Sequence, residues 1–202
     1  DLERHPPPVA THADVRDLRD LPWSSIDNAT SRDLDQLEVA ETTADGATRV
    51  MIAIADVDAF VAKDSPIDAF AAAQTTTVYT DVKIFPMLPV ELSTDLTSLN
   101  EGVDRFAIIA DMIVKENGDV PESTFYRALV RNHAKCAYED IGEWLDNGGN
   151  MPEALQKTHG LKEQIELQRE AAIRLHAYRQ SKGALEFESI ESSALVEDGE
   201  IK

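Results

Sequence analysis

The sequence predicts an α+β domain on two observations. Short apolar runs with strand-like alternation fill the first two-thirds of the chain, with helical stretches inserted between them, and a long helical segment follows. With 202 residues, 43% of them hydrophobic, the chain is long enough to bury a sizeable core. No run reaches about 18 apolar residues, so we expect no membrane span and no membrane partner.

The charge balance restricts the partners that the surface can attract. Asp and Glu total 38 against 19 Lys and Arg, which gives a formal net charge of −19. Such a surface repels polyanions over most of its area, whereas a site that holds cations between carboxylates is permitted. The first residues lack the pattern of a secretory signal, and the single Cys136 has no disulfide partner in the chain, so we expect a reducing, cytoplasmic setting.

The first third predicts a lead-in followed by a hairpin. Residues 1–25 contain three consecutive prolines and a charged run, which indicate an extended lead-in. Residues 36–40 alternate and residues 48–55 are rich in Val and Ile, with an Asp-Gly turn signal at 44–46 between them. This pattern is typical of a β-hairpin.

The middle of the chain predicts a helix and a second strand pair. A Ser-Pro pair precedes residues 67–73, which we expect to form a short helix with serine as its cap. Residues 106–114 and 124–132 read as strands joined across the Asn-Gly turn signal at 117–118.

The last third is mainly helical. We expect a helix over 138–145 that ends at a glycine pair, and a longer one over 152–179 that Gly160 divides. A strand at 184–187 and a turn at 198–199 complete the prediction. The apolar stripe of the long helix is predicted to consist of Leu161, Ile165, Ala172, Ile173 and Leu175.

An acidic cluster precedes the first hairpin. Asp27, Asp33, Asp35 and Gln36 fall within ten positions, and Asp33 and Asp35 project to one face if their segment is extended. Carboxylate and amide oxygens suit Mg²⁺, and such a cluster can serve metal-assisted phosphodiester chemistry. By spacing alone an acidic, solvated loop is the commoner explanation, and the glycine and glutamate of an EF-hand loop are missing.

Ordered motifs extend from residue 17 to the C-terminus. They are DLRDLP at 17–22, ID at 26–27, SRDLD at 31–35, IADV at 54–57, a tyrosine at 79, FPMLP at 85–89, ELS at 91–93, LTSLN at 96–100, Gly102 with Asp104 and Arg105, and GALEF at 183–187. In this order and spacing they resemble the N-terminal part of the RNB catalytic domain of the ribonuclease II family. The resemblance implies a mixed sheet with flanking helices, and it assigns residues 26–202 to that part of the domain.

The family's activity and site follow from the same resemblance. It implies a processive 3′→5′ exoribonuclease that degrades single-stranded RNA to nucleoside 5′-monophosphates with one or two Mg²⁺ ions, Mn²⁺ being a possible substitute. The metal ligands would be Asp27, Asp33, Asp35 and Gln36, with Asp33 and Asp35 catalytic. Tyr79, Tyr138 and Phe187 match aromatic residues that contact the RNA 3′ end. By sequence alone, packing in the core is the commoner explanation for Tyr138 and Phe187, and for Tyr79 the two explanations are balanced.

Other polar residues are expected to be structural. Asp56 lies inside an apolar run and is either a buried, hydrogen-bonded acid, which we favour, or a distant member of the site. His133 and His159 read as structural or surface groups.

The chain also departs from the family pattern. Gln36 stands where the family has a fourth aspartate, which leaves open, as the alternative to the exoribonuclease, a catalytically weak module that binds RNA 3′ ends. A third alternative is a small acidic fold with no role on nucleic acids. The family's Ser-Pro-Ile-Arg-Arg motif is absent, so we expect activity to need a C-terminal half of the enzyme, possibly as a separate chain.

Overall fold

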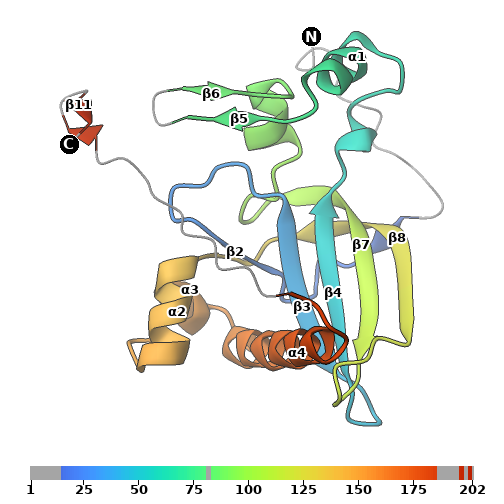
Figure 1. Ribbon diagram of the computed structural model, residues 1–202, viewed down its shortest axis with the longest axis vertical. Helices are drawn as coiled ribbons and strands as arrows, with labels where there is room; N and C mark the ends of the chain where they lie inside the picture. The colour runs from blue at the N-terminus through green and yellow to red at the C-terminus, as the bar shows by residue number, and fades with distance from the viewer. Residues whose placement is uncertain (1–14, 81–82, 186–195, 198–199, 202) are drawn as a thin grey trace.

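A seven-stranded mixed sheet forms the centre of the protein (Figure 1). The computed structural model describes residues 15–80, 83–185, 196–197 and 200–201. The strand order is β1-β8-β7-β4-β3-β2-β9. The strands are β1 (Arg16–Asp17), β2 (Ser24–Asp27), β3 (Gln36–Thr42), β4 (Thr48–Ala55), β7 (Asp104–Val114), β8 (Glu122–Arg131) and β9 (Ala134–Ala137). The predicted α+β class and mixed sheet are confirmed.

Two antiparallel hairpins form the middle of this sheet, as the turn signals predict. In the first, β3 pairs with β4 from Gln36↔Ile54 to Thr42↔Thr48. In the second, β7 pairs with β8 across a turn at Gly118, whose φ is +80°. A Cβ atom at Gly118 would lie 2.1 Å from the carbonyl oxygen of Arg174, so this turn packs directly on a helix and requires glycine.

Parallel pairing closes the two edges of the sheet. At one edge β2 runs parallel to β9, in register from Ser24↔Ala134 to Asp27↔Ala137. At the other, β1 runs parallel to β8. Residues 15–25, which the sequence assigns to an extended lead-in, thus contribute to the sheet, and Trp23 within them is fully buried with its indole N–H donating to the Leu18 carbonyl at 2.7 Å.

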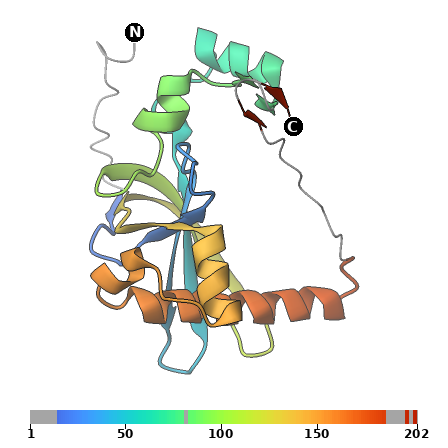
Figure 2. The same cartoon turned by 90° about the vertical axis from the view of Figure 1, so that its left-hand side faces the viewer.

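The three helices that follow β9 in the chain lie on one face of the sheet and beside its β9 edge (Figures 1 and 2). Helix α4 (Leu161–Ser181) crosses the half of the sheet distant from residues 31–35, which we call the acidic segment. Helices α2 (Tyr138–Asn147) and α3 (Glu153–Lys157) pack against the N-terminal end of α4 and against β9. The predicted division of the long helix at Gly160 and the glycine end of α2 are confirmed.

The apolar stripe predicted for the long helix is partly wrong. Leu161 and Ile165 are buried as expected, but Ala171 rather than Ala172 is buried, and Ile173 is 53% exposed. The reason is that α4 covers only part of the sheet. Ala172 lines an open groove between α2, α4 and the β3–β4 hairpin, and Ile173 projects to solvent.

A smaller layer lies beyond the opposite end of the sheet (Figures 1 and 2). It contains α1 (Pro66–Gln74) and the short hairpin of β5 (Val78–Tyr79) with β6 (Ile84–Phe85). Ser65 caps α1 by accepting from the Asp68 amide, as predicted. A short 3₁₀ segment, Val57–Ala59, and a π-helical turn, Leu92–Leu96, connect this layer to the sheet.

The C-terminal predictions fall largely outside the described residues. Ala184 and Leu185 are not in a strand, while residues 186–187, with Phe187, and the turn at 198–199 are outside the described part. Strands β10 (Val196–Glu197) and β11 (Glu200–Ile201) pair antiparallel. No helix in the described residues is long and apolar enough to cross a bilayer.

Candidate active site

The acidic segment forms one wall of a cavity of about 650 Å³ at the β2–β3 end of the sheet. Leu34 is buried in the core, while its two neighbours Asp33 and Asp35 are exposed and both line the cavity. The alternation is that of an extended chain, in which every second side chain faces the same way. The two aspartates therefore share a face because the apolar residue between them is anchored.

Hydrogen bonds from a distant segment hold this wall in place. The Ser98 hydroxyl accepts from the Leu34 amide at 3.0 Å and donates to the Arg32 carbonyl at 2.9 Å. The Leu99 amide donates to the Leu34 carbonyl at 2.8 Å, and the Ala55 amide donates to the Asp35 carbonyl at 2.9 Å. The backbone on both sides of Leu34 is thus fixed to the sheet.

Asp27, at the end of β2, lines the same cavity from the other side. Its Oδ1 accepts from the Asn28 amide at 2.7 Å and from the Ser31 hydroxyl at 2.9 Å. The Lys135 ammonium on β9 donates to the carbonyls of Ala29 and Ser31, which secures the loop from behind. The loop therefore folds Asp27 back towards Asp33 and Asp35.

Gln36 begins β3 and lines the cavity, and Glu38 lies two positions further on the same face of the strand. The sequence reasoning missed Glu38, although a lone acid in an apolar strand is a usable signal. Its Oε2 is buried and has no hydrogen-bond partner among the described residues. Burial, with the charge of Asp35 as a second cause, raises the pKa of Glu38 to about 7.

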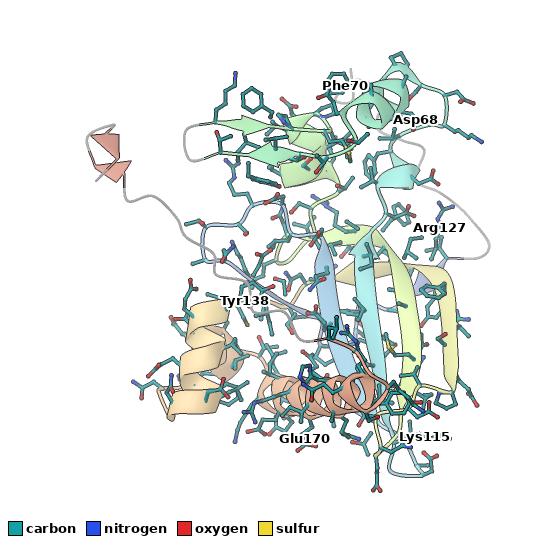
Figure 3. All side chains as sticks on the ribbon, viewed as in Figure 1. Asp68, Phe70, Lys115, Arg127, Tyr138 and Glu170 are labelled. Atoms are coloured by element: carbon teal, nitrogen blue, oxygen red, sulfur yellow. The ribbon has the colours of Figure 1, made fainter. Side chains whose placement is uncertain are left out.

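Two of the three predicted aromatic residues border the cavity. Tyr79, on β5, donates its hydroxyl to Asp33 Oδ2 at 3.0 Å, and its ring is 64% exposed. Tyr138, the first residue of α2, is 53% exposed and lines the cavity at the β2 side (Figure 3). Exposed aromatic rings beside a polar cavity are available for stacking on a ligand. The third, Phe187, lies outside the described residues.

Negative charge dominates the cavity. Burial raises the pKa of Asp35, and the nearby carboxylates of Asp27 and Asp33 raise it further. A divalent cation would relieve this repulsion, and three carboxylates with one amide oxygen are a donor set that fits Mg²⁺ or Mn²⁺. As they stand, however, no three His, Cys, Asp or Glu side chains in the described part of the chain are close enough to hold a metal ion.

The structure agrees with the expectation that Asp56 is a buried acid and that His133 and His159 are structural or surface groups. Asp56 is 3% exposed and its Oδ2 accepts from Arg127 Nε at 2.9 Å, as a buried, hydrogen-bonded acid should. His133 bonds the Arg19 carbonyl through Nε2 at 2.8 Å, and His159 is exposed. Cys136 is buried, and burial raises the pKa of its thiol to about 11.

Sheet and cavity together define an α+β domain whose site combines clustered carboxylates with exposed aromatic rings. The chain belongs to the RNB domain family, because the family model matches residues 15–202. The membership predicted from the ordered motifs is confirmed.

Curated relatives and a solved structure agree with this membership. The chain is 34% identical over 176 residues to ribonuclease R of Vibrio parahaemolyticus, covering 87% of this chain and 21% of that protein. It is 34% identical over 164 residues to exoribonuclease 2 of Cronobacter sakazakii, covering 81% and 25%. Ribonuclease R of Mycoplasma genitalium, solved in complex with ribose-methylated single-stranded RNA, superposes with a TM-score of 0.82 at 26% identity, covering 93% of this chain and 28% of that one. The chain thus spans about a fifth to a quarter of the length of these curated relatives.

Proposed function

We propose that this chain carries the carboxylate site of a metal-dependent exoribonuclease that degrades single-stranded RNA processively from its 3′ end to nucleoside 5′-monophosphates. The single observation that carries the proposal is the composition of the 650 Å³ cavity, which Asp27, Asp33, Asp35 and Gln36 line together with Tyr79 and Tyr138. Membership of the RNB family, with relatives named ribonuclease R and exoribonuclease 2, supports the choice of RNA as substrate.

The side chains divide the chemistry between them. Asp27, Asp33 and Asp35 would hold one or two Mg²⁺ ions, or Mn²⁺, with the Gln36 amide oxygen as a neutral ligand. When bound, such an ion polarises a phosphoryl oxygen and lowers the pKa of a coordinated water. Asp33 and Asp35 are the catalytic carboxylates, and Asp35 is the one whose pKa both burial and its neighbours raise.

The aromatic residues orient the RNA end. Bases stack on exposed rings regardless of sequence, at about 1–3 kcal/mol per base. Tyr79 is restrained by its bond to Asp33, so a base stacked on it would lie beside the carboxylates. Tyr138 offers a second ring at the β2 side, and Phe187 completes the set that the family resemblance assigns to the RNA 3′ end.

Completion of the site by a C-terminal half of the enzyme is part of the proposal. The described part of the cavity is rich in carboxylates, and phosphoryl transfer needs cationic groups to stabilise the developing charge. Residues 1–202 alone are therefore expected to be inactive. A cytoplasmic, reducing setting fits Cys136, which is buried and has no partner cysteine in the chain.

Gln36 supports a second candidate function. An amide carries no charge, so the site has one negative charge fewer than a set of four carboxylates, which weakens its hold on a divalent cation. The second candidate is a module that binds RNA 3′ ends through Tyr79 and Tyr138 and hydrolyses them poorly. The two functions differ in turnover and share the binding surface.

The test is digestion of a 5′-labelled single-stranded RNA by the intact protein, with Mg²⁺ or with EDTA. The proposal predicts a ladder that shortens from the 3′ end with Mg²⁺ and intact RNA with EDTA. With Asp35→Asn the RNA should stay intact even with Mg²⁺. Asp20→Asn should digest the RNA as wild type does, because Asp20 is an exposed aspartate that does not line the cavity. RNA that is bound but not shortened would establish the second candidate instead.

A further inference from the structure

A second cavity adjoins the carboxylate cavity behind Tyr79. Its volume is about 410 Å³, which lies in the range of small-molecule sites. Tyr79, Asp33 and Ser31 line both cavities and so form the wall between them. We call the second cavity the Arg32 pocket, after the one side chain with a positive charge among its lining residues.

The guanidinium of Arg32 has no partner in the described part of the chain. Seven of the described arginines form side-chain hydrogen bonds or ion pairs, at positions 19, 49, 105, 127, 131, 169 and 174, and Arg16 stacks on Tyr126. Arg32 and Arg179 make no such contact there. The chain has 38 acids against 19 bases, yet Arg32, next to Asp33, forms no ion pair among the described residues and keeps its positive charge available to a ligand.

The backbone of Arg32 is nevertheless held firmly. Its carbonyl accepts from the buried Ser98 hydroxyl, and the same hydroxyl accepts from the Leu34 amide two residues further on. The side chain therefore starts from a fixed point at the pocket and keeps its five N–H donors for a ligand. A free guanidinium in this position selects an anion with planar or tetrahedral oxygens, such as a phosphate.

The remaining walls suit the other parts of a nucleotide. Tyr79, Ile84 and Pro86 provide an apolar side on which a base or ribose can pack, and Ser93 and Thr94 provide hydroxyl groups. Both Tyr79 and Ile84 are more than half exposed, so their surfaces are free for contact. One cation, one apolar wall and several hydroxyls, with the Asp33 carboxylate at the wall shared with the first cavity, fit a nucleoside monophosphate within about 410 Å³.

We infer that the Arg32 pocket is a second nucleotide subsite, which binds a nucleoside 5′-phosphate group with Arg32 on the phosphate and the Tyr79 side on the base or ribose. The identification of the ligand as a nucleotide rests on the proposed function. Two sources share this chemistry, the released nucleoside 5′-monophosphate and a nucleotide still within the RNA chain.

The test measures binding of adenosine 5′-monophosphate and of adenosine to the intact protein by calorimetry in EDTA. Without metal the three aspartates of the carboxylate cavity repel phosphate, whereas the Arg32 pocket has one guanidinium beside the single Asp33 carboxylate, so a loss of binding in Arg32→Ala reports on that pocket. We expect Arg32→Ala to weaken the affinity for the monophosphate at least about tenfold, because hydrogen bonds to a charged group contribute a free energy of that size. The affinity for adenosine, which has no phosphate, should not change. Arg32→Lys should restore part of the affinity. Arg179→Ala, the matched unpaired arginine on α4, should have no effect.

A second arm distinguishes the two sources of the nucleotide. It measures the affinity of a single-stranded oligoribonucleotide in EDTA for the same variants. An unchanged RNA affinity in Arg32→Ala identifies the subsite with the released monophosphate, and a parallel loss identifies it with the bound RNA.

The inference is overturned if wild type does not bind the monophosphate, or if Arg32→Ala binds both ligands as wild type does. Its failure is separable from that of the proposed function. If wild type hydrolyses RNA but Arg32→Ala binds the monophosphate as wild type does, the subsite alone is refuted. If monophosphate binding depends on Arg32 but wild type does not hydrolyse RNA, the proposed function alone is refuted.

Discussion

The hydroxyl of Tyr79 donates a hydrogen bond to Asp33 Oδ2 at 3.0 Å, across 46 positions of sequence. This bond joins the β5–β6 hairpin to the acidic segment before β3, and the ring that it restrains is 64% exposed. The position of the ring relative to the carboxylates therefore depends on one polar contact rather than on burial in a core.

Replacing Tyr79 tests that dependence. We expect Tyr79→Ala in the intact protein to change the length of the shortest RNA products, because a stacking platform worth about 1–3 kcal/mol is lost at the end of the RNA. Tyr79→Phe keeps the ring and loses only the bond to Asp33, so its products should lie closer to those of wild type. Product lengths are read on a sequencing gel, and identical products for all three proteins would make Tyr79 a packing residue.

Asp35→Asn tests the catalytic carboxylate. The substitution removes one charge from the metal and water-activating position, so we expect hydrolysis to fall at least about 100-fold. RNA affinity in EDTA should stay close to that of wild type, because the side chain keeps its size. Single-turnover rates and filter-binding affinities check the two halves of this prediction. Hydrolysis within a few-fold of wild type would exclude Asp35 from the chemistry.

Gln36→Asp tests whether Gln36 contributes to metal binding. A fourth carboxylate adds negative charge to the cavity, so half-maximal activity should require less Mg²⁺ than in wild type. Gln36→Ala should shift the requirement in the opposite direction. If neither variant changes the Mg²⁺ dependence, Gln36 is not a ligand. If Gln36→Asp turns an inactive protein into an active one, the binding-module function describes the natural sequence.

Ser98→Ala tests the anchor of the acidic segment. The variant leaves the buried Leu34 amide and the Arg32 carbonyl without their hydroxyl partner, which should lower the free energy of unfolding by about 1–3 kcal/mol. It should also weaken Mg²⁺ activation, because Asp33 and Asp35 flank Leu34. Ser123→Ala, at an exposed serine of β8 that lines neither cavity, is the control for loss of a hydroxyl. A loss of stability with unchanged Mg²⁺ dependence would show that the anchor supports the fold and not the site.

Asp111→Asn tests an ion pair between the neighbouring strands β4 and β7, which does not line the cavity. Hydrogen bonds from Arg49, at 2.6 and 2.9 Å, and from Tyr126 hold the pKa of Asp111 below its ordinary value. A carboxyl group whose pKa is lower in the folded than in the unfolded protein stabilises the fold at a pH above its unfolded-state pKa. This stabilisation is lost as the pH falls through its folded-state pKa.

The variant should therefore unfold more easily at pH 7, by about 1–3 kcal/mol, and lose less stability than wild type below about pH 4. Denaturant titrations at pH 7 and pH 3 measure both effects, with Asp20→Asn as the control. Parallel stability curves for the variant and wild type would contradict the linkage.

The sequence predicts those parts of the fold that depend on local signals. Both central hairpins join strands that are neighbours in sequence, and their glycine turns mark the connections. The pairing of β2 with β9 joins segments more than 100 residues apart, and β2 itself is only four residues long. Short strands paired over such distances carry too little local pattern to be predicted.

The same contrast holds at the site. Asp33 and Asp35 are two positions apart on an extended chain, so their common face follows from geometry. The approach of Tyr79 and Tyr138 to them depends on tertiary packing, and only the family resemblance indicated it. Arg32 was overlooked because an arginine between acids is ordinarily paired with them, and only the structure shows its guanidinium without a partner among the described residues.

The most direct test of the central claim is the identity of the products that the intact protein releases from single-stranded RNA. Mass spectrometry of a time course with Mg²⁺ should show nucleoside 5′-monophosphates from the first time point. With EDTA, or with Asp35→Asn, none should accumulate. Nucleoside 3′-monophosphates, internal fragments, or an equal rate in EDTA would contradict a metal-dependent 3′→5′ exoribonuclease site built on Asp27, Asp33 and Asp35.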